Sequence, residues 1–455
     1  MVLASWVSAL LRGVSVAAAL LAIAALLRWG AARRRAKEKG AGRVLRACSV
    51  ALLALGCAAV AWAGVSAVGS IADRRPVPAE ALPYLTESAH EINLSDDVIV
   101  PEAFGDIDSY RVFLAGEYHT LAKSYAAKKL MVRSLYEHAG VRYLLVESGF
   151  GAGLLLEHYV QAGDEALLDA EEAARKGTLS YNRETRDFWT WLRGFNAGLP
   201  EGERIHVVGL DVDHQTSNAA RGIAMLAEGG EELPGPWGAL LNRLREGDEA
   251  AVGEAADLIA DNETKAQRAF GDNLDLARRV CESVDAADRY YDALNGGDEE
   301  ASNEIRDGWM MASFEFACGR APAGARFFGQ FGSEHVYRAA CDTPYGSKAF
   351  DRFAMRLDGE GSPVAGEVCS ILYAYTSAGA LPFLRAYGDS DRYLNYGPLE
   401  PWYGKDALFA LDGAGSPFAE EPVFVKRGAD ERAPDTAYFQ KLLLLSDSAE
   451  TSPLE

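Results

Sequence analysis

Four separate segments of the chain have the length and apolar character of a buried β-strand, and an acidic residue or a histidine ends or closely follows each one. Helical patterns lie between these segments. Strand–helix–strand units form parallel sheets, and the carboxyl ends of parallel strands meet at one edge of the sheet. The feature therefore predicts an α/β fold with a mostly parallel sheet flanked by helices. The four segments are 111–117, 141–147, 204–211 and 325–332, and two further strands are expected at 368–373 and 407–411.

The polar residues at these strand ends are the candidates for chemistry. Glu117 and His119 are two positions apart, so in extended chain their side chains point the same way. The carboxylate can then orient the imidazole and raise its basicity, which is what a general base needs. The other strand ends supply Glu147, Asp211 and His335, and we expect all five side chains to meet in one crevice. For each residue alone, a solvated loop position or a structural histidine is the simpler interpretation.

Residues 1–75 differ from the rest of the chain. Two apolar runs, at 6–29 and 47–71, each have about the length that a bilayer requires. The stretch from Arg28 to Arg46, at and after the end of the first run, carries eight Lys or Arg and the single acid Glu38. Because basic loops stay in the cytoplasm, the sequence predicts a two-helix transmembrane hairpin with both chain ends outside. The expected location is the cell membrane, as a multi-pass protein whose C-terminal domain is extracytoplasmic.

The charge distribution follows the same division. Residues 1–75 carry a net charge of +9 and the remainder −30, which together give the −21 of the whole chain. An acidic outer domain favours solubility and repels the phosphates of nucleic acids. The basic loop lies between two apolar runs, which also argues against nucleic acid as a partner.

The domain boundaries follow from composition. Residues 76–108 indicate a linker that enters the domain, and 109–428 indicate the α/β domain itself. Within it, about 231–300 is acidic, alanine-rich and helical in pattern, so we expect a helical insertion that could cover the site. The charged residues 429–455 predict a peripheral tail.

Four cysteines lie outside the predicted membrane hairpin, at Cys281, Cys318, Cys341 and Cys369. Their spacing is too wide for a zinc knuckle. In an oxidising compartment they allow one or two disulfides with three possible pairings, and buried free thiols are the equal alternative.

Short motifs recur in a fixed order along the chain: Gly116-Glu117-Tyr118-His119, a helix with Lys128, the strand ending at Glu147, 191–196, Gly209-Leu210-Asp211, Arg306-Asp307 and 329–335. This ordered set resembles the erythromycin esterase family from about residue 108 to 415. The departures are Thr120, where family members usually have glycine, and Gln330, where the first of a pair of histidines is expected. The shorter Gly-Glu-x-His form is similar to that of Tiki-type metalloproteases and ChaN-like haem-binding lipoproteins in the same superfamily.

The resemblance implies a hydrolase in which His119 activates water, without a metal or other cofactor, to attack an ester or lactone of a small-molecule substrate. Glu117 and Glu147 would be its carboxylate partners, and His335 a second catalytic or oxyanion-stabilising imidazole. Arg306 would anchor the substrate or its charge, and we group Asp211 with it. Two alternatives use the same strand ends. Glu117, His119, Glu147 and His335 also suit a divalent ion such as zinc or manganese in a metal-dependent hydrolase or protease. A non-catalytic module that binds haem or another ligand through a histidine is the third interpretation.

Overall fold

The computed structural model describes residues 77–454, except 228–235, 344–349, 377–393, 429 and 431. The predicted transmembrane hairpin at 1–75 lies outside these residues. Among the residues that are described, none of the helices combines the length and the apolarity needed to cross a bilayer.

The described residues form one eight-stranded sheet in the order β1-β7-β8-β6-β2-β5-β3-β4. The six strands from β8 to β4 are parallel, whereas β7 runs antiparallel to both β8 and β1. This confirms the mostly parallel α/β sheet, and all six expected strands are present. The strands are β1 (Ala89–Glu91), β2 (Val112–Glu117), β3 (Tyr143–Gly149), β4 (His206–Asp211), β5 (Phe327–Gly332), β6 (Val368–Tyr375), β7 (Ala407–Ala410) and β8 (Lys441–Leu445).

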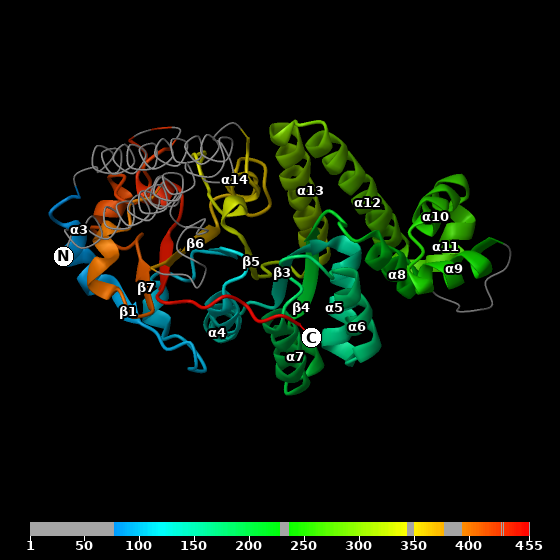
Figure 1. Cartoon of the computed structure of the whole chain (residues 1–455), viewed down its shortest axis with the longest axis horizontal. Helices are drawn as coiled ribbons and strands as arrows, with labels where there is room; N and C mark the ends of the chain where they lie inside the picture. Colours follow the sequence, from blue (N-terminus) through cyan, green and yellow to red (C-terminus); the bar gives the residue numbers. More distant parts are fainter. Residues whose placement is uncertain are drawn as a thin grey trace, which may run out of the picture. The chain divides into compact units, whose positions relative to one another are not determined.

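Twelve α-helices are described; most of them flank the sheet, whereas α9 to α11 lie away from it (Figure 1). Helix α4 ends where the sequence predicted, because Gly140 takes the left-handed conformation that commonly closes a helix. The helices are α3 (Ala81–Ser88), α4 (Ala122–Ala139), α5 (Phe150–Ala162), α6 (Glu165–Ala174), α7 (Arg183–Ala197), α8 (Thr216–Leu226), α9 (Pro236–Glu246), α10 (Ala250–Asp261), α11 (Glu263–Phe270), α12 (Leu274–Asn295), α13 (Glu299–Arg320) and α14 (Phe353–Asp358).

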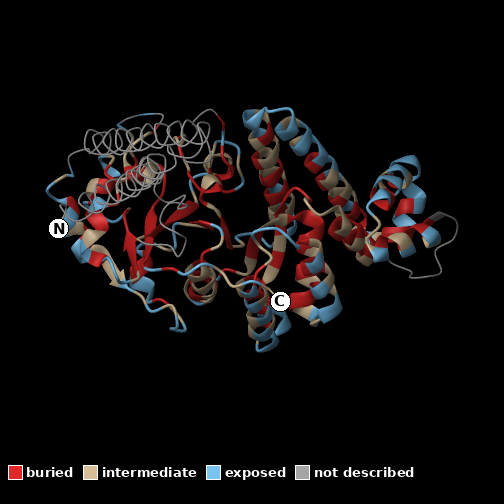
Figure 2. Ribbon diagram, viewed as in Figure 1, coloured by how far each residue is buried: buried red, intermediate tan, exposed pale blue. Residues whose placement is uncertain are grey.

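Both faces of the central strands are covered. Side chains alternate along β2, so Phe113 packs in the core shared with α4 and α7, while Leu114 packs in the core shared with α13 and α14. All six residues of β2 are buried. Figure 2 shows the same pattern, with buried strands and helices that are exposed only on their outer sides. A strand buried on both faces has the continuous apolar run that marked it in the sequence.

The register of the parallel strands fixes where the polar strand ends lie. Glu117 of β2 is opposite Gly332 of β5, and Asp211 of β4 is opposite Gly149 of β3. The pairing of β3 with β4 is irregular between Val146 and Gly149. Glu147 lies within that irregular stretch, and such bulges re-aim side chains beside active sites.

The predicted helical insertion is present as α9 to α12, and α13 follows it. Helices α12 and α13 lie side by side, and α9 to α11 pack at the far end of α12 (Figure 1). The insertion and α8 share their own apolar core with α5, around Phe150 and Val280. Helix α13 returns from the insertion to the sheet and brings Arg306 to the carboxyl ends of the strands.

Both ends of the described chain differ from the expected linker and tail. Residues 76–108 supply α3 and β1, and 429–455 supply β8, which lies between β7 and β6. Lys441 opens β8 and is almost fully buried, because its ammonium pairs with Asp412. Because charged residues surround this short strand in the sequence, we expected an exposed tail here and did not predict a buried strand.

The four cysteines outside the predicted hairpin are all free thiols. Of the two alternatives that the sequence left open, the structure therefore has free thiols and not disulfides. Burial raises the pKa of Cys281, Cys341 and Cys369 to about 12. Thiols with such pKa values are poor nucleophiles at neutral pH.

Candidate active site

Glu117 and His119 form a direct pair at the end of β2. His119 Nδ1 lies 2.6 Å from Glu117 Oε1. The side chain of Glu117 is 10% exposed, while that of His119 is 47% exposed. The negative charge of Glu117 is the main cause that raises the pKa of His119 to about 9. The expected pair is therefore present, with Nδ1 held by the carboxylate and Nε2 left for other partners.

The backbone is strained just after this pair. Thr120 has a φ of 71°, in the left-handed region that a β-branched residue rarely adopts. The residue at this position is glycine in the family that the motif resembles, and glycine takes this conformation without a steric penalty. A hydrogen bond from Thr451 N–H to the Thr120 carbonyl holds this turn.

Arg306 links two strand ends. Its Nε donates to Asp211 Oδ1 at 2.9 Å, and its Nη2 donates to Glu147 Oε1 at 2.8 Å. Asp211 is fully buried, and the Arg306 charge holds the pKa of that carboxyl far below its usual range against the opposing effect of burial. Nη1 of Arg306 makes no hydrogen bond to the described residues, which leaves one end of the guanidinium available.

Glu147 receives a partner on each oxygen. Oε1 accepts from Arg306 and lies 3.5 Å from His335 Nε2, while Oε2 accepts from Gly332 N–H at 2.6 Å. Burial alone would raise the pKa of Glu147, but His335, His119 and Arg306 together lower it well below its ordinary value. Glu147 is therefore an ionised, fixed carboxylate.

His335 is buried between two acids. Its Nδ1 lies 2.9 Å from Asp307 Oδ1, the same oxygen that accepts from Phe353 N–H. Burial is the largest single effect and lowers the pKa of His335, but the charge and hydrogen bond of Asp307 together with the hydrogen bond of Glu147 outweigh it, and the net result is a pKa of about 10. The ring is 7% exposed, so His335 mainly holds Glu147 in place.

Gly332 joins the two halves of the site. A Cβ placed on Gly332 would lie 3.1 Å from His119 Nε2 and 3.7 Å from Glu147 Oε2. The free nitrogen of His119 and the Glu147 carboxylate therefore border the same small space, which exists because residue 332 has no side chain. The structure brings together all six predicted site residues: Glu117, His119, Glu147, Asp211, Arg306 and His335.

Asp213 and His214, which closely follow Asp211, contact different parts of the structure. His214 Nε2 lies 3.3 Å from Asp211 Oδ2, and its Nδ1 lies 2.9 Å from the Tyr291 hydroxyl. Asp213 does not cap α8, the helix that follows it. Its carboxylate accepts from Gly151 N–H at the start of α5, and burial raises its pKa to about 6. The sequence showed the capping residue but not which helix it caps.

Lys128 lies on α4 beside the acids. Its Nζ is 4.4 Å from the centre of the Phe188 ring and 5.7 Å from that of Trp189. Burial lowers its pKa to about 8, against the opposing charges of Glu117 and Glu147. Cation–π contacts of this kind stabilise a cation by about 0.5–2 kcal/mol, and they make up much of the environment of the Lys128 ammonium.

In this arrangement the four residues of the metal alternative, Glu117, His119, Glu147 and His335, each have a protein partner. Among the described residues, no group of three or more His, Cys, Asp or Glu side chains is placed to hold a metal ion. Glu147, which would have to be a ligand, is already bonded to Arg306 and to Gly332 N–H. A cation would have to displace that guanidinium.

Sequence reasoning did not assign Asp307 or Gly332 to the site. Asp307 was visible as the neighbour of Arg306, but adjacent residues on a helix face different directions, and only the fold shows that both point into the site. The role of Gly332 is a backbone N–H and an absence of side chain, for which a sequence gives no chemical signal.

Comparisons with known proteins agree with this fold. The model of the erythromycin esterase family matches residues 136–326, which include Glu147, Asp211 and Arg306 but neither Glu117, His119 nor His335. No curated protein matches the chain.

Three solved structures are similar to this chain. A succinoglycan biosynthesis protein has a TM-score of 0.54 at 14% identity, with 82% of this chain and 98% of that chain covered. A mutant of the erythromycin esterase EreC in its open conformation has a TM-score of 0.51 at 11% identity, with 76% and 93% covered. A Bacillus cereus protein has a TM-score of 0.52 at 13% identity, with 83% and 99% covered. The likeness to these structures shows the fold, and the family match places a similarity to erythromycin esterases in residues 136–326.

Proposed function

We propose that this chain is a hydrolase that activates water at His119 to cleave an ester or lactone of a small molecule. The family supports the reaction class. The observation that carries the residue assignment is the Glu117–His119 pair, in which Nδ1 is held and Nε2 borders the space beside Gly332. A general base needs this combination of a fixed ring and one free nitrogen.

The proposed step is ordinary ester hydrolysis. Neutral His119 takes a proton from water at Nε2 while the water oxygen attacks the carbonyl carbon. The tetrahedral intermediate collapses by breaking the bond to the alcohol oxygen, which takes the proton back from the imidazolium. Water and ester thus give one acid and one alcohol.

Arg306 is the candidate to meet the negative charge that develops on the carbonyl oxygen. Its Nε and Nη2 are taken by Asp211 and Glu147, which fix the plane of the guanidinium. The unbonded Nη1 can then donate to the oxyanion with little reorganisation, and this preorganisation makes such donors effective. Glu147, Asp211, Asp307 and His335 act by positioning, since their polar atoms are turned toward one another and Arg306.

The protonation state sets a condition on this mechanism. With a pKa of about 9, His119 is neutral in about one molecule in a hundred at pH 7. The enzyme is therefore expected to be more active in mildly alkaline solution.

The proposed setting is the outer side of a cell membrane. This rests on the two apolar runs and the basic loop of residues 1–75, together with the strongly acidic remainder. Protease added to intact cells is expected to remove the acidic domain, and full protection of that domain would overturn the placement.

The test of the function is hydrolysis of a panel of aryl and lactone esters by the full-length protein, with His119→Ala beside wild type. His90→Ala is the matched control, because His90 lies in β1 at the opposite edge of the sheet from β4. We expect His119→Ala to lose at least a hundredfold in kcat/KM. Equal activity of the two histidine variants would refute the assignment.

The same assay with a chelator distinguishes the metal-dependent alternative from the proposed reaction, because the proposed reaction should be unaffected by the chelator. Haem titration separates the binding-module alternative. A Soret band that appears in wild type and is lost in His119→Ala, without turnover of any ester, would replace the hydrolase by that module.

A further inference from the structure

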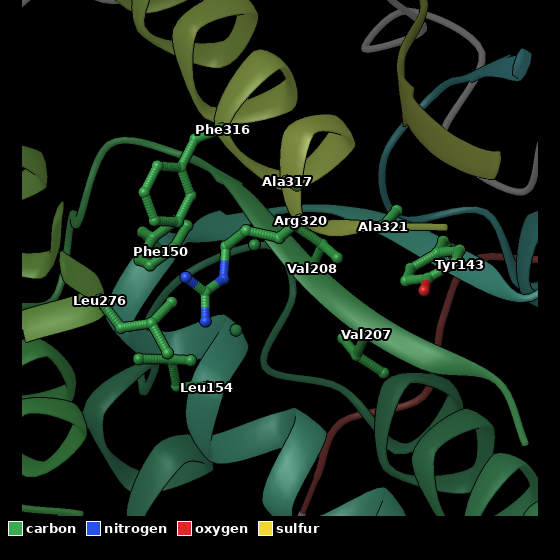
Figure 3. A pocket seen from close by; sticks show the side chains of 12 residues that line it. Tyr143, Phe150, Leu154, Val207, Val208, Leu276, Phe316, Ala317, Arg320 and Ala321 are labelled. Carbon is green, nitrogen blue, oxygen red and sulfur yellow. The ribbon is translucent and has the colours of Figure 1, made fainter. Parts of the chain in front are cut away.

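A second concave site lies away from the strand ends that carry the acids. It is a pocket of about 160 Å³ beside β4, the last strand of the sheet, and its walls come from β3, α5, α12 and α13 (Figure 3). Arg320, the last residue of α13, lines this pocket, whereas Arg306 of the same helix is fourteen residues earlier and reaches the catalytic acids. At 1.5 Å per residue the two arginines are about 21 Å apart along the helix.

The walls of the pocket are apolar. Phe150 and Phe316 meet edge to face at 5.8 Å between ring centres. Leu154 and Leu276 stand on the side below them in Figure 3. Gly153 packs directly on Gly209, where a Cβ would lie 2.3 Å from the Gly209 nitrogen, so the wall toward β4 is largely main chain. The lining offers a contact surface for a hydrocarbon group.

The guanidinium of Arg320 extends across this apolar pocket, between Phe316 and Leu154 in the view of Figure 3. Arg320 is an exposed residue, and its guanidinium carbon lies 5.7 Å from the centre of the Phe316 ring. No carboxylate among the described residues pairs with it, although most of the arginines in these residues have an acidic partner. The other polar side chain in the lining is Tyr143, at the opposite end of the view.

A cation in the last turn of a helix has a structural role, because it interacts favourably with the helix dipole by about 0.3–1 kcal/mol. That role does not require the guanidinium to lie over a pocket or to remain without an acid. An arginine presents a planar fork of donors that fits a carboxylate with two parallel hydrogen bonds.

We propose that this pocket binds a small monocarboxylate whose apolar part is about the size of one benzene ring or a six-carbon chain. The size follows from the volume, since an apolar cavity of about 150 Å³ accommodates benzene. The single negative charge follows from the single unpaired cation in the lining. The proposal is independent of the hydrolase assignment, because none of the catalytic residues lines this pocket.

The test is calorimetric titration of the full-length protein with phenylacetate and with hexanoate. Both are expected to bind with one-to-one saturation at millimolar or lower concentration. Arg320→Gln removes the charge and leaves a shorter polar side chain, and we expect it to weaken phenylacetate binding at least tenfold. The neutral analogue 2-phenylethanol should bind wild type more weakly than phenylacetate, and Arg320→Gln should not change its affinity.

Two variants place the ligand. Ala317→Leu fills the pocket from α13 and is expected to abolish binding, while circular dichroism checks that the protein remains folded. His119→Ala alters the other site and should leave phenylacetate binding unchanged. Retained binding in Ala317→Leu with loss in His119→Ala would move the ligand to the catalytic site and overturn the proposal. So would a lack of saturation in wild type, or equal affinities of wild type and Arg320→Gln.

Discussion

The space beside Gly332 is the narrowest point of the candidate active site. A methyl group there would lie 3.1 Å from His119 Nε2, closer than ordinary van der Waals contact of about 3.5–4.0 Å. We expect Gly332→Ala to lower kcat/KM about tenfold or more with little change in the free energy of unfolding. Gly194→Ala is the matched control, because a Cβ at that helical position meets nothing within 4 Å. A fully active Gly332→Ala enzyme would show that catalysis does not use this space.

At Thr120, by contrast, removal of the side chain is expected to stabilise the protein. Its positive φ costs about 1–3 kcal/mol for a residue with a branched side chain, whereas glycine loses about 0.5–1 kcal/mol of chain entropy. Thr120→Gly is therefore expected to raise the free energy of unfolding by about 1 kcal/mol and to keep activity. Urea unfolding measures the change, and a destabilised variant would mean that the hydroxyl or methyl of Thr120 contributes more than the strain costs.

The pH dependence of the reaction reports on His119. A raised pKa means that the ring holds its proton to higher pH, so kcat/KM should increase with pH through about pH 9 and level off only above it. Glu117→Gln removes the charge that raises the pKa, and the rise should then move toward the ordinary histidine value of about 6.5. Profiles of wild type and Glu117→Gln that superimpose would contradict the role of this pair.

The sequence predicted that Glu117 and His119 lie together because their signal is local. Glu117 and His119 are two residues apart on one strand, and extended geometry places them together. Arg306 is different, since its partners Glu147 and Asp211 come from two strands far away in the chain. Its place in the site could be taken from the resemblance but not from its own surroundings in the sequence.

The last residues of the chain form hydrogen bonds with the turn at Thr120, directly after β2. Ala122 N–H donates to the Ala449 carbonyl at 3.0 Å, and Thr451 N–H donates to the Thr120 carbonyl at 2.8 Å. Arg183 N–H, at the start of α7, donates to the Ser452 carbonyl at 2.9 Å. The segment thus ties the turn after β2 to a second helix.

Removal of residues 447–455 should leave β8 and the sheet intact but release this turn. We expect kcat/KM to fall at least tenfold with a smaller effect on the unfolding midpoint, since few apolar side chains are lost. A chain shortened only by its last two residues is the control. Full activity of the longer deletion would show that the turn holds its shape without the segment.

At the level of elements, the sequence predicted six of the eight described strands and missed β1 and β8. Strand β8 has five residues and begins with a lysine, and β1 has the sequence Ala89-His90-Glu91. Both are stabilised by neighbours far along the chain rather than by their own composition. The helical insertion was visible because its apolar residues recur with helical spacing over many turns.

The whole protein is expected to be most stable in mildly acidic solution. The pKa values of His119 and His335 are raised to about 9 and 10, so their contribution to stability is full below the unfolded value of about 6.5 and is lost as pH rises through 9–10. The raised pKa of Asp213 acts in the same direction up to about pH 6. The lowered pKa values of Glu147 and Asp211 act oppositely, and their contribution is lost as pH falls below the ordinary carboxyl range.

These signs place the maximum of stability between about pH 4.5 and 6.5, below the pH at which the activity should be greatest. Urea unfolding at pH 5.5, 7.5 and 9.5 should show a steady decline. His335→Gln should reduce the slope of that decline. Stability that increases from pH 5.5 to 9.5 would mean that the two histidines are neutral in the folded protein.

The order of the strands also has a consequence for synthesis. Strand β5 lies between β2 and β3, yet the ribosome makes it about 180 residues after β3. Until it arrives, β2 and β3 each have an edge with unpaired backbone groups, and parallel pairing over such distances is slow. The emerging chain therefore exposes strand edges that can pair with other chains for most of its translation. These edges are covered only when β5, followed by β6 and β8, joins the sheet. We expect its production in cells to depend strongly on chaperones that shield nascent polypeptides.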